Sequence, residues 1–219
     1  MNLEQARQNM VEQQIRTWEV LDQEVLDLLY LVPREEFVPP QYRALAFSDM
    51  EIPLGKAPGQ KMWQPKMEAR IVQELALKKS DRVLEVGTGS GYLAALLAHR
   101  AGQVDSVEID PALSELARAN LARQEIANVA LHAGDAARGW EKQAPYDAIV
   151  LTGSTPLLPQ AFLDQLAVGG RLFAVVGEAP AMTAKLIACT APGAYGTVEL
   201  FETVIAPLVN CEHPPRFSF

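Results

Sequence analysis

The chain has 219 residues, of which 49% are hydrophobic, and its 27 acidic and 19 basic residues give a net charge of −8. This length predicts one domain with a sizeable core, and the acidic balance excludes the basic surface of a DNA- or RNA-binding protein. The sequence contains no apolar run near the roughly 18 residues of a membrane span, and its polar N-terminus lacks the apolar region of a signal peptide. Because Cys189 and Cys211 make no disulfide framework, we expect reduced thiols in a cytoplasmic protein. We expect a monomer or a weak homo-oligomer with no nucleic-acid or membrane partner.

The first 75 residues predict three helices and one long loop. Residues 3–16 place apolar side chains at helical spacing. Asp22 can cap a second helix, which Pro33 stops. Residues 48–64 are irregular, and a loop of this length is often functional. Pro65 suits the start of the third helix.

From residue 81 onward, strand patterns alternate with helical patterns. We expect strands at 82–86, 103–108, 128–132, 146–152 and 170–176. We expect helices at 91–100, 111–124 and 158–166, with a short turn near 136–140. Two further apolar runs, near 183–190 and 196–205, predict an antiparallel hairpin at one sheet edge.

This alternation predicts a doubly wound α/β fold with a seven-stranded, mostly parallel sheet. We expect one domain over residues 1–219, in which residues 1–64 form N-terminal helices and a loop and residues 65–219 form the α/β core. The helical extension is expected to pack over the ligand cleft.

A glycine-rich turn follows the first strand of the α/β core. Gly87, Gly89 and Gly91 separate an apolar strand from an apolar helix. This geometry brings backbone N–H groups and a helix N-terminus up to a ligand. The third glycine of a dinucleotide fingerprint would fall at Tyr92, so the spacing disfavours an NAD-dependent oxidoreductase.

Polar residues follow several strands at the rim where parallel strands end. Glu85 lies inside the first of these strands, and Glu108 ends the next, where a carboxylate can accept both hydroxyl hydrogens of a ribose. Asp135 either accepts from an adenine amino group or caps the next turn. The three histidines are scattered along the chain, so we expect no metal.

The glycine turn and its two acids resemble the nucleoside-methyl-donor site of S-adenosylmethionine-dependent methyltransferases. Over nearly its whole length the chain resembles the protein-L-isoaspartate O-methyltransferase family. The similar segments are 10–16, 32–39, 59–60 with 64–65, 83–92, 134–140, 144–149, 159–166 and 206–209. Of these, the helical segment 10–16, the segment 32–39 and the pairing of Gly134-Asp135 with Gly139-Trp140 are the most particular to this family.

The resemblance implies S-adenosylmethionine as cofactor and methyl transfer to an isoaspartyl carboxylate of a protein or peptide, in protein repair. The cofactor-binding residues that it implies are Gln60, Lys61, Met62, Trp63, Glu85, Gly87, Thr88, Gly89, Ser90, Gly91, Glu108, Ile109, Asp135 and Ala136. The candidate acceptor-binding regions are the loop 55–64 and the segment 152–156, and the candidate residues are Gly55, Thr152, Gly153, Ser154 and Val209.

The loop at 59–65 departs from the family pattern. The family typically has Gly-Gln-Thr-Ile-Ser-Gln-Pro, whereas this chain has Gly-Gln-Lys-Met-Trp-Gln-Pro. Trp63 therefore stands at the position of a serine regarded as catalytically important in the family, and Lys61 replaces a threonine. Two interpretations follow. Trp63 packs against the N-terminal helices, or it points into the cleft, in which case the chain methylates a different acceptor or binds the donor without turnover.

Overall fold

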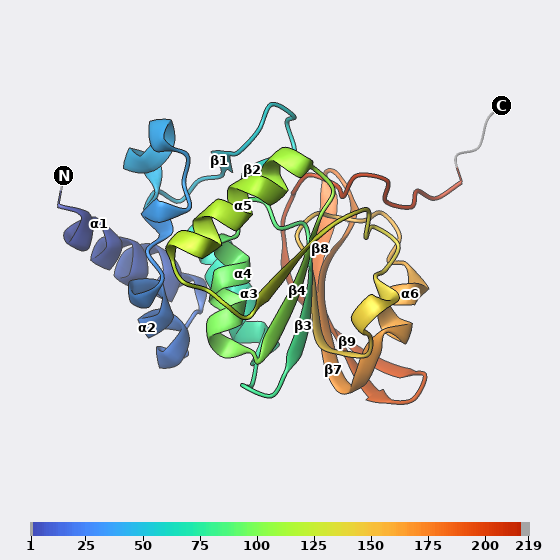
Figure 1. Cartoon of the computed structure of the whole chain (residues 1–219). Helices are drawn as coiled ribbons and strands as arrows, with labels where there is room; N and C mark the ends of the chain where they lie inside the picture. The colour runs from blue at the N-terminus through green and yellow to red at the C-terminus, as the bar shows by residue number, and fades with distance from the viewer. Residues whose placement is uncertain (1, 216–219) are drawn as a thin grey trace.

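The computed structural model describes residues 2–215, so residues 216–219 of the tail lie outside this range. Its centre is a seven-stranded sheet in the order β5-β4-β3-β6-β7-β8-β9 (Figure 1). The strands are β3 (Arg82–Val86), β4 (Gln103–Glu108), β5 (Val129–Ala133), β6 (Tyr146–Leu151), β7 (Leu166–Glu178), β8 (Ala181–Ala191) and β9 (Ala194–Glu202). The strands from β5 to β7 are parallel, while β8 and β9 pair antiparallel. The predicted fold class and terminal hairpin are confirmed.

One strand begins earlier than expected. The sequence predicts this strand from residue 170, but β7 begins at Leu166, which pairs with Tyr146 before a register shift in the β6–β7 ladder. The glycine pair at 169–170 therefore lies inside the strand and not before it.

The helices of the core connect these strands. They are α3 (Pro65–Leu75), α4 (Tyr92–Arg100), α5 (Pro111–Arg123) and α6 (Gln160–Asp164). Figure 1 shows α3, α4 and α5 on one side of the sheet and α6 on the other. Between β5 and β6, the Gly139 N–H donates to the carbonyl oxygen of Ala136, which confirms the turn expected near 136–140. A 3₁₀ turn, η5 (Glu141–Gln143), follows it.

Adjacent residues of a strand pack into two separate apolar cores on opposite faces of the sheet. Val83 belongs to the larger core, which also includes α3 and α4, while Leu84 belongs to the smaller core with Phe162 of α6. This division follows from the alternation of side chains across a sheet. Both faces are covered, as the nearly continuous apolar strands require. Among the described residues, we find no helix whose length and apolarity would let it cross a membrane.

The N-terminal helices pack beside the core helices. They are α1 (Leu3–Asn9), the π-helical η1 (Met10–Ile15), the 3₁₀ turn η2 (Arg16–Trp18) and α2 (Gln23–Leu31), which Asp22 caps through the backbone N–H of Glu24. Two 3₁₀ turns follow, η3 (Arg34–Glu36) and η4 (Pro40–Leu45). Met10 and Ile15 are buried in the larger core, and η1 and α2 contact α3.

The expected placement of this extension needs a correction. None of the residues from η4 back to α1 lines the rim cavity described below, so these helices brace α3 and α4 and do not cover the cleft. The two-stranded ribbon β1 (Ile52–Pro53) and β2 (Lys61–Met62), with the loop between its strands, reaches the rim instead (Figure 1).

Candidate active site

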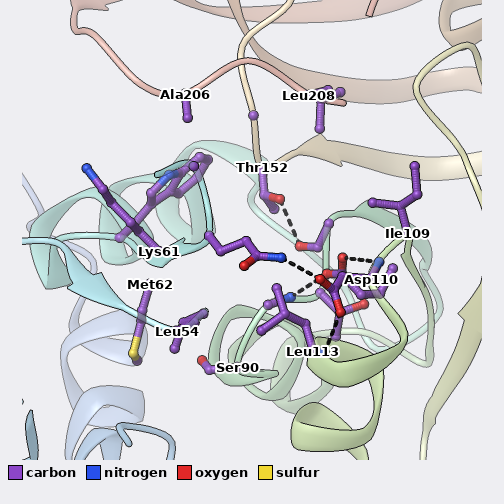
Figure 2. A pocket seen from close by; sticks show the side chains of 18 of the residues that line it. Leu54, Lys61, Met62, Ser90, Ile109, Asp110, Leu113, Thr152, Ala206 and Leu208 are labelled. Atoms are coloured by element: carbon purple, nitrogen blue, oxygen red, sulfur yellow. Dashed lines mark hydrogen bonds between the residues drawn. The ribbon is translucent and has the colours of Figure 1, made fainter. Parts of the chain in front are cut away.

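A cavity of about 480 Å³ opens at the rim where the parallel strands end. Figure 2 shows Ala206 and Leu208 on one side of it and Leu54, Ser90 and Leu113 on the other. The residues that line it are Leu54, Ala57, Pro58, Gly59, Gln60, Lys61, Met62, Trp63, Glu68, Glu85, Gly87, Thr88, Gly89, Ser90, Leu93, Glu108, Ile109, Asp110, Leu113, Thr152, Gly153, Ala206, Pro207, Leu208 and Val209. The volume lies in the range of small-molecule sites.

The glycine turn forms the floor of this cavity, and Thr152 holds its shape. Gly87 has a φ of +96°, and a Cβ there would lie 2.1 Å from Thr152 Oγ1. That hydroxyl donates toward the carbonyl oxygens of Val86 and Gly87, both at 2.8 Å. Thr152 lines the cavity as expected, but its only hydroxyl proton is used to fix the turn.

Glu108 ties the glycine turn to the start of α5. Its Oε2 accepts from the backbone N–H of Gly89 at 2.9 Å, and its Oε1 accepts from that of Asp110 at 3.0 Å. Each carboxylate oxygen has a second lone pair. Glu108, only 5% exposed, is therefore held rigidly and can still accept hydrogen bonds from a ligand.

Asp110 links α5 to the loop across the cavity. It caps α5 by accepting from the backbone N–H groups of Ala112 and Leu113, and Gln60 Nε2 donates to its other oxygen. The Ala112 bond, with smaller contributions from Leu113 and Gln60, holds the pKa of Asp110 below its usual value. The loop around Gln60 is thereby fastened over the cavity.

Glu85 lies fully buried in the cavity wall with one oxygen unpartnered. Its Oε2 accepts from Ser106 Oγ, which lies 2.6 Å from Thr88 Oγ1, whereas Oε1 has no partner among residues 2–215. Burial raises the pKa of Glu85 to about 8. The group is therefore mostly protonated at neutral pH, and a cation beside it would favour the charged form.

Asp135 borders a second cavity of about 40 Å³ that adjoins the first, because Gly87, Glu108 and Val209 line both. Asp135 Oδ1 accepts from the backbone N–H of Ala137 at 2.9 Å, so it does cap its own turn. Asp135 and Ala136 thus lie beside the main cavity and not inside it.

Trp63 lies between the larger core and the cavity. Trp63 is 8% exposed and belongs to the larger core, yet it also lines the cavity. Its carbonyl oxygen accepts from Arg34 Nη2. Lys61, the other residue that departs from the family pattern, also lines the cavity. Its ammonium lies 2.7 Å from Glu51 Oε2.

Three predicted site residues line neither cavity. A Cβ on Gly91 would meet Ala117 and Leu121 at 3.3 Å, so this glycine lets α4 approach α5. Gly55 packs against the Gln60 side chain. Ser154 is fully buried and pairs through its backbone with the tail segment 206–208, so it positions that segment.

Several lining residues were not predicted. They are Leu54, Glu68, Leu93, Asp110, Leu113, Ala206, Pro207 and Leu208. The sequence does contain an indication for Glu68, because this acid shares a helix face with the apolar residues Ile71 and Val72. The tail residues pair with Ser154 at the rim, and no local pattern indicates this pairing.

Comparisons with known proteins agree on one family. The family model described as "Protein-L-isoaspartate(D-aspartate) O-methyltransferase (PCMT)" matches residues 5–212. A protein-L-isoaspartate O-methyltransferase of Methanoculleus marisnigri is 45% identical over 78% of this chain and 77% of its own length. That of Gloeobacter violaceus is 38% identical over 92% of this chain and 97% of its own.

Solved structures support the same assignment. A protein-L-isoaspartate O-methyltransferase superposes with a TM-score of 0.79 at 26% identity, covering 92% of this chain and 65% of that chain. A Plasmodium falciparum structure in complex with S-adenosyl-L-homocysteine shares the fold, with a TM-score of 0.78 at 21% identity over 95% of this chain and 98% of that chain. With a family model matched over nearly its whole length, the chain belongs to the protein-L-isoaspartate(D-aspartate) O-methyltransferase family.

Proposed function

We propose that this chain transfers a methyl group from S-adenosylmethionine to the carboxylate of an isoaspartyl residue in a protein or peptide, as a step in protein repair. The observation that carries this proposal is the rim cavity in which the glycine turn meets Glu108, in a chain of this family. The alternatives raised by Trp63, a different acceptor or donor binding without turnover, are not favoured by the comparisons.

The cavity fits S-adenosylmethionine, the cofactor of the family. Glu108 would accept from the ribose hydroxyls and Asp135 from the adenine amino group, while the backbone of Gly87 and Gly89 faces the amino-acid end. Glu85 lines the same cavity, and a positively charged ligand beside it would favour its charged form. We extend this cofactor contact to Ile109 and to the loop residues 60–63, which line the same cavity.

The chemistry asks little of acid–base groups. When bound, the cofactor supplies an electrophilic methyl group on a sulfonium. The α-carboxyl of an isoaspartyl residue has a pKa of roughly 3.5, so it is ionised at neutral pH without a general base. The task of the protein is to align a carboxylate oxygen with the methyl group and to keep water away. The loop fastened by the Gln60–Asp110 bond serves both purposes.

The acceptor would enter between the loop 55–63 and the tail segment 206–209. Gly153 and Val209 border this opening, and Lys61 lines it with its ammonium paired to Glu51. Thr152 and Ser154 act indirectly, the first by holding the glycine turn and the second by holding the tail. Trp63 forms the wall between the acceptor's path and the larger core.

We also propose that the chain works as one domain, because residues from Met10 to Ile205 share the larger core. Two unpaired, buried thiols, Cys189 and Cys211, suit a cytoplasmic enzyme. We propose a monomer or a weak homo-oligomer.

Incubation with methyl-labelled donor and an isoaspartyl peptide tests the proposed function. We expect a labelled methyl ester on the isoaspartyl carboxylate. Donor binding without ester formation would overturn the assignment of the acceptor, while tight binding of NAD in place of S-adenosylhomocysteine would overturn that of the cofactor.

A further inference from the structure

Glu68 is a buried carboxylate in the cavity wall that the proposed function does not use. It lies in the first turn of α3, is 3% exposed and lines the cavity. Its Oε2 is paired with Arg34 Nη1. Within residues 2–215 we find no hydrogen bond to its other oxygen, Oε1, and Oε1 is not among the partnerless atoms sealed from the surface. That oxygen therefore faces the cavity.

The guanidinium of Arg34 holds Glu68 in place from behind. Arg34 is fully buried, does not line the cavity, and donates to the carbonyl oxygens of Ala46 and Trp63 as well as to Glu68. Burial lowers the pKa of Arg34 to about 10, so it stays charged at neutral pH. A ligand in the cavity consequently meets the carboxylate and not the guanidinium.

The contacts of Glu68 show at which end of the cavity it lies. The guanidinium carbon of Arg34 lies 4.9 Å from the ring centre of Tyr92, the first residue of α4 after the glycine turn. Glu68 therefore lies at the glycine-turn end, whereas Asp135 follows β5, two strands away in the sheet. The proposed function assigns the glycine-turn end to the amino-acid part of the donor.

We propose that Glu68 Oε1 accepts a hydrogen bond from the α-ammonium of S-adenosylmethionine and so recognises the amino-acid end of the donor. This inference rests on the proposed cofactor site. A carboxylate already fixed by a buried arginine loses little freedom on binding and makes a charge-assisted hydrogen bond. The competing explanation is that Glu68 only neutralises Arg34, since an unpaired buried charge is costly.

Titration calorimetry with three ligands separates these explanations. S-Adenosylhomocysteine has the ammonium and the carboxylate, its decarboxylated analogue keeps only the ammonium, and methylthioadenosine has neither. For Glu68→Gln we expect about tenfold weaker binding of the first two ligands and binding of methylthioadenosine within about twofold of wild type. Glu74→Gln removes an acid of the same helix that lies outside the cavity and pairs with Arg70, and it is expected to leave all three affinities within about twofold.

Other outcomes would overturn the inference. Equal weakening of all three ligands by Glu68→Gln would mean that Glu68 only supports the fold, and unchanged affinities would mean that it does not touch the donor. If Glu68→Gln does not fold, Glu68→Asp keeps the charge and shortens the reach, and it must show the same selectivity. A wild-type chain that binds none of the three would refute the proposed function and this inference together, whereas normal wild-type binding with an unselective variant refutes only this inference.

Discussion

Asn210 donates a hydrogen bond from its Nδ2 to Asp135 Oδ2 at 2.8 Å and so joins the tail to the turn after β5. The neighbouring residues Leu208 and Val209 line both cavities, so this bond holds one wall of the proposed adenosine site. Asp135 can still accept from a ligand through its remaining lone pairs.

Replacing Asn210 by Ala is therefore expected to weaken S-adenosylhomocysteine binding by about fivefold, the equivalent of roughly 1 kcal/mol for one hydrogen bond. Calorimetry measures the affinity, and hydrogen exchange at the Leu208 amide, which donates to Ser154, should become faster. Tighter binding by the variant would show instead that Asn210 competes with the ligand for Asp135.

Because the carboxyl group of Glu85 titrates near neutral pH, we expect cofactor binding to depend on pH. Its pKa of about 8 in the free protein is raised by burial, and the positive charge of S-adenosylmethionine would lower it in the complex. The complex then binds fewer protons than the free protein, so affinity should rise with pH up to about 8, by at most about tenfold per pH unit. Calorimetry in buffers of different ionisation enthalpy should detect proton release.

The matched control is Glu85→Gln, which keeps the size of the side chain and removes its titration. We expect this variant to lose the part of the pH dependence that Glu85 causes. An identical pH profile for both proteins would assign that dependence to the ligand or to another group.

Trp63 is expected to contribute strongly to the stability of the fold. Because its indole packs in the larger core, Trp63→Ser should lower the free energy of unfolding by about 3–5 kcal/mol. Trp63→Phe retains much of the apolar area and should lose clearly less. Urea unfolding of the three proteins measures this, and a loss below about 1 kcal/mol for Trp63→Ser would show that the ring lies loosely in the cavity.

Replacing Glu108 is expected to lower the affinity for the cofactor. Glu108→Ala removes the proposed ribose acceptor and the support of the Gly89 and Asp110 N–H groups. A charge-assisted hydrogen bond of about 1.5–3 kcal/mol corresponds to roughly 10- to 150-fold weaker S-adenosylhomocysteine binding. An affinity within twofold of wild type would exclude Glu108 from the cofactor site.

The sheet could be predicted because its signals are local. The bounds of β3 and β4 match the expected ones, since each is an apolar run that ends at a turn or an acid. The early start of β7 could not be predicted, because it depends on pairing between Leu166 and Tyr146 across a register shift.

Part of the site also follows from local sequence, whereas another part depends on tertiary contacts. Backbone conformation at Gly87 and Gly89 follows from the sequence, and these residues do line the cavity. Ser154 is close to Thr152 in the chain, but its backbone pairs with the tail in the structure. Leu208 depends on that same tertiary pairing, so no window of sequence around it points to the site.

Methyl transfer to an isoaspartyl carboxylate is tested most directly by initial rates on an isoaspartyl peptide and on its aspartyl twin. Both peptides are offered at equal concentration with saturating labelled S-adenosylmethionine, after calorimetry has established that the chain binds S-adenosylhomocysteine. We predict labelled methyl ester from the isoaspartyl peptide and none above background from its twin. Equal labelling of the two peptides, or no labelling of either by a chain that binds the donor, would contradict the claim.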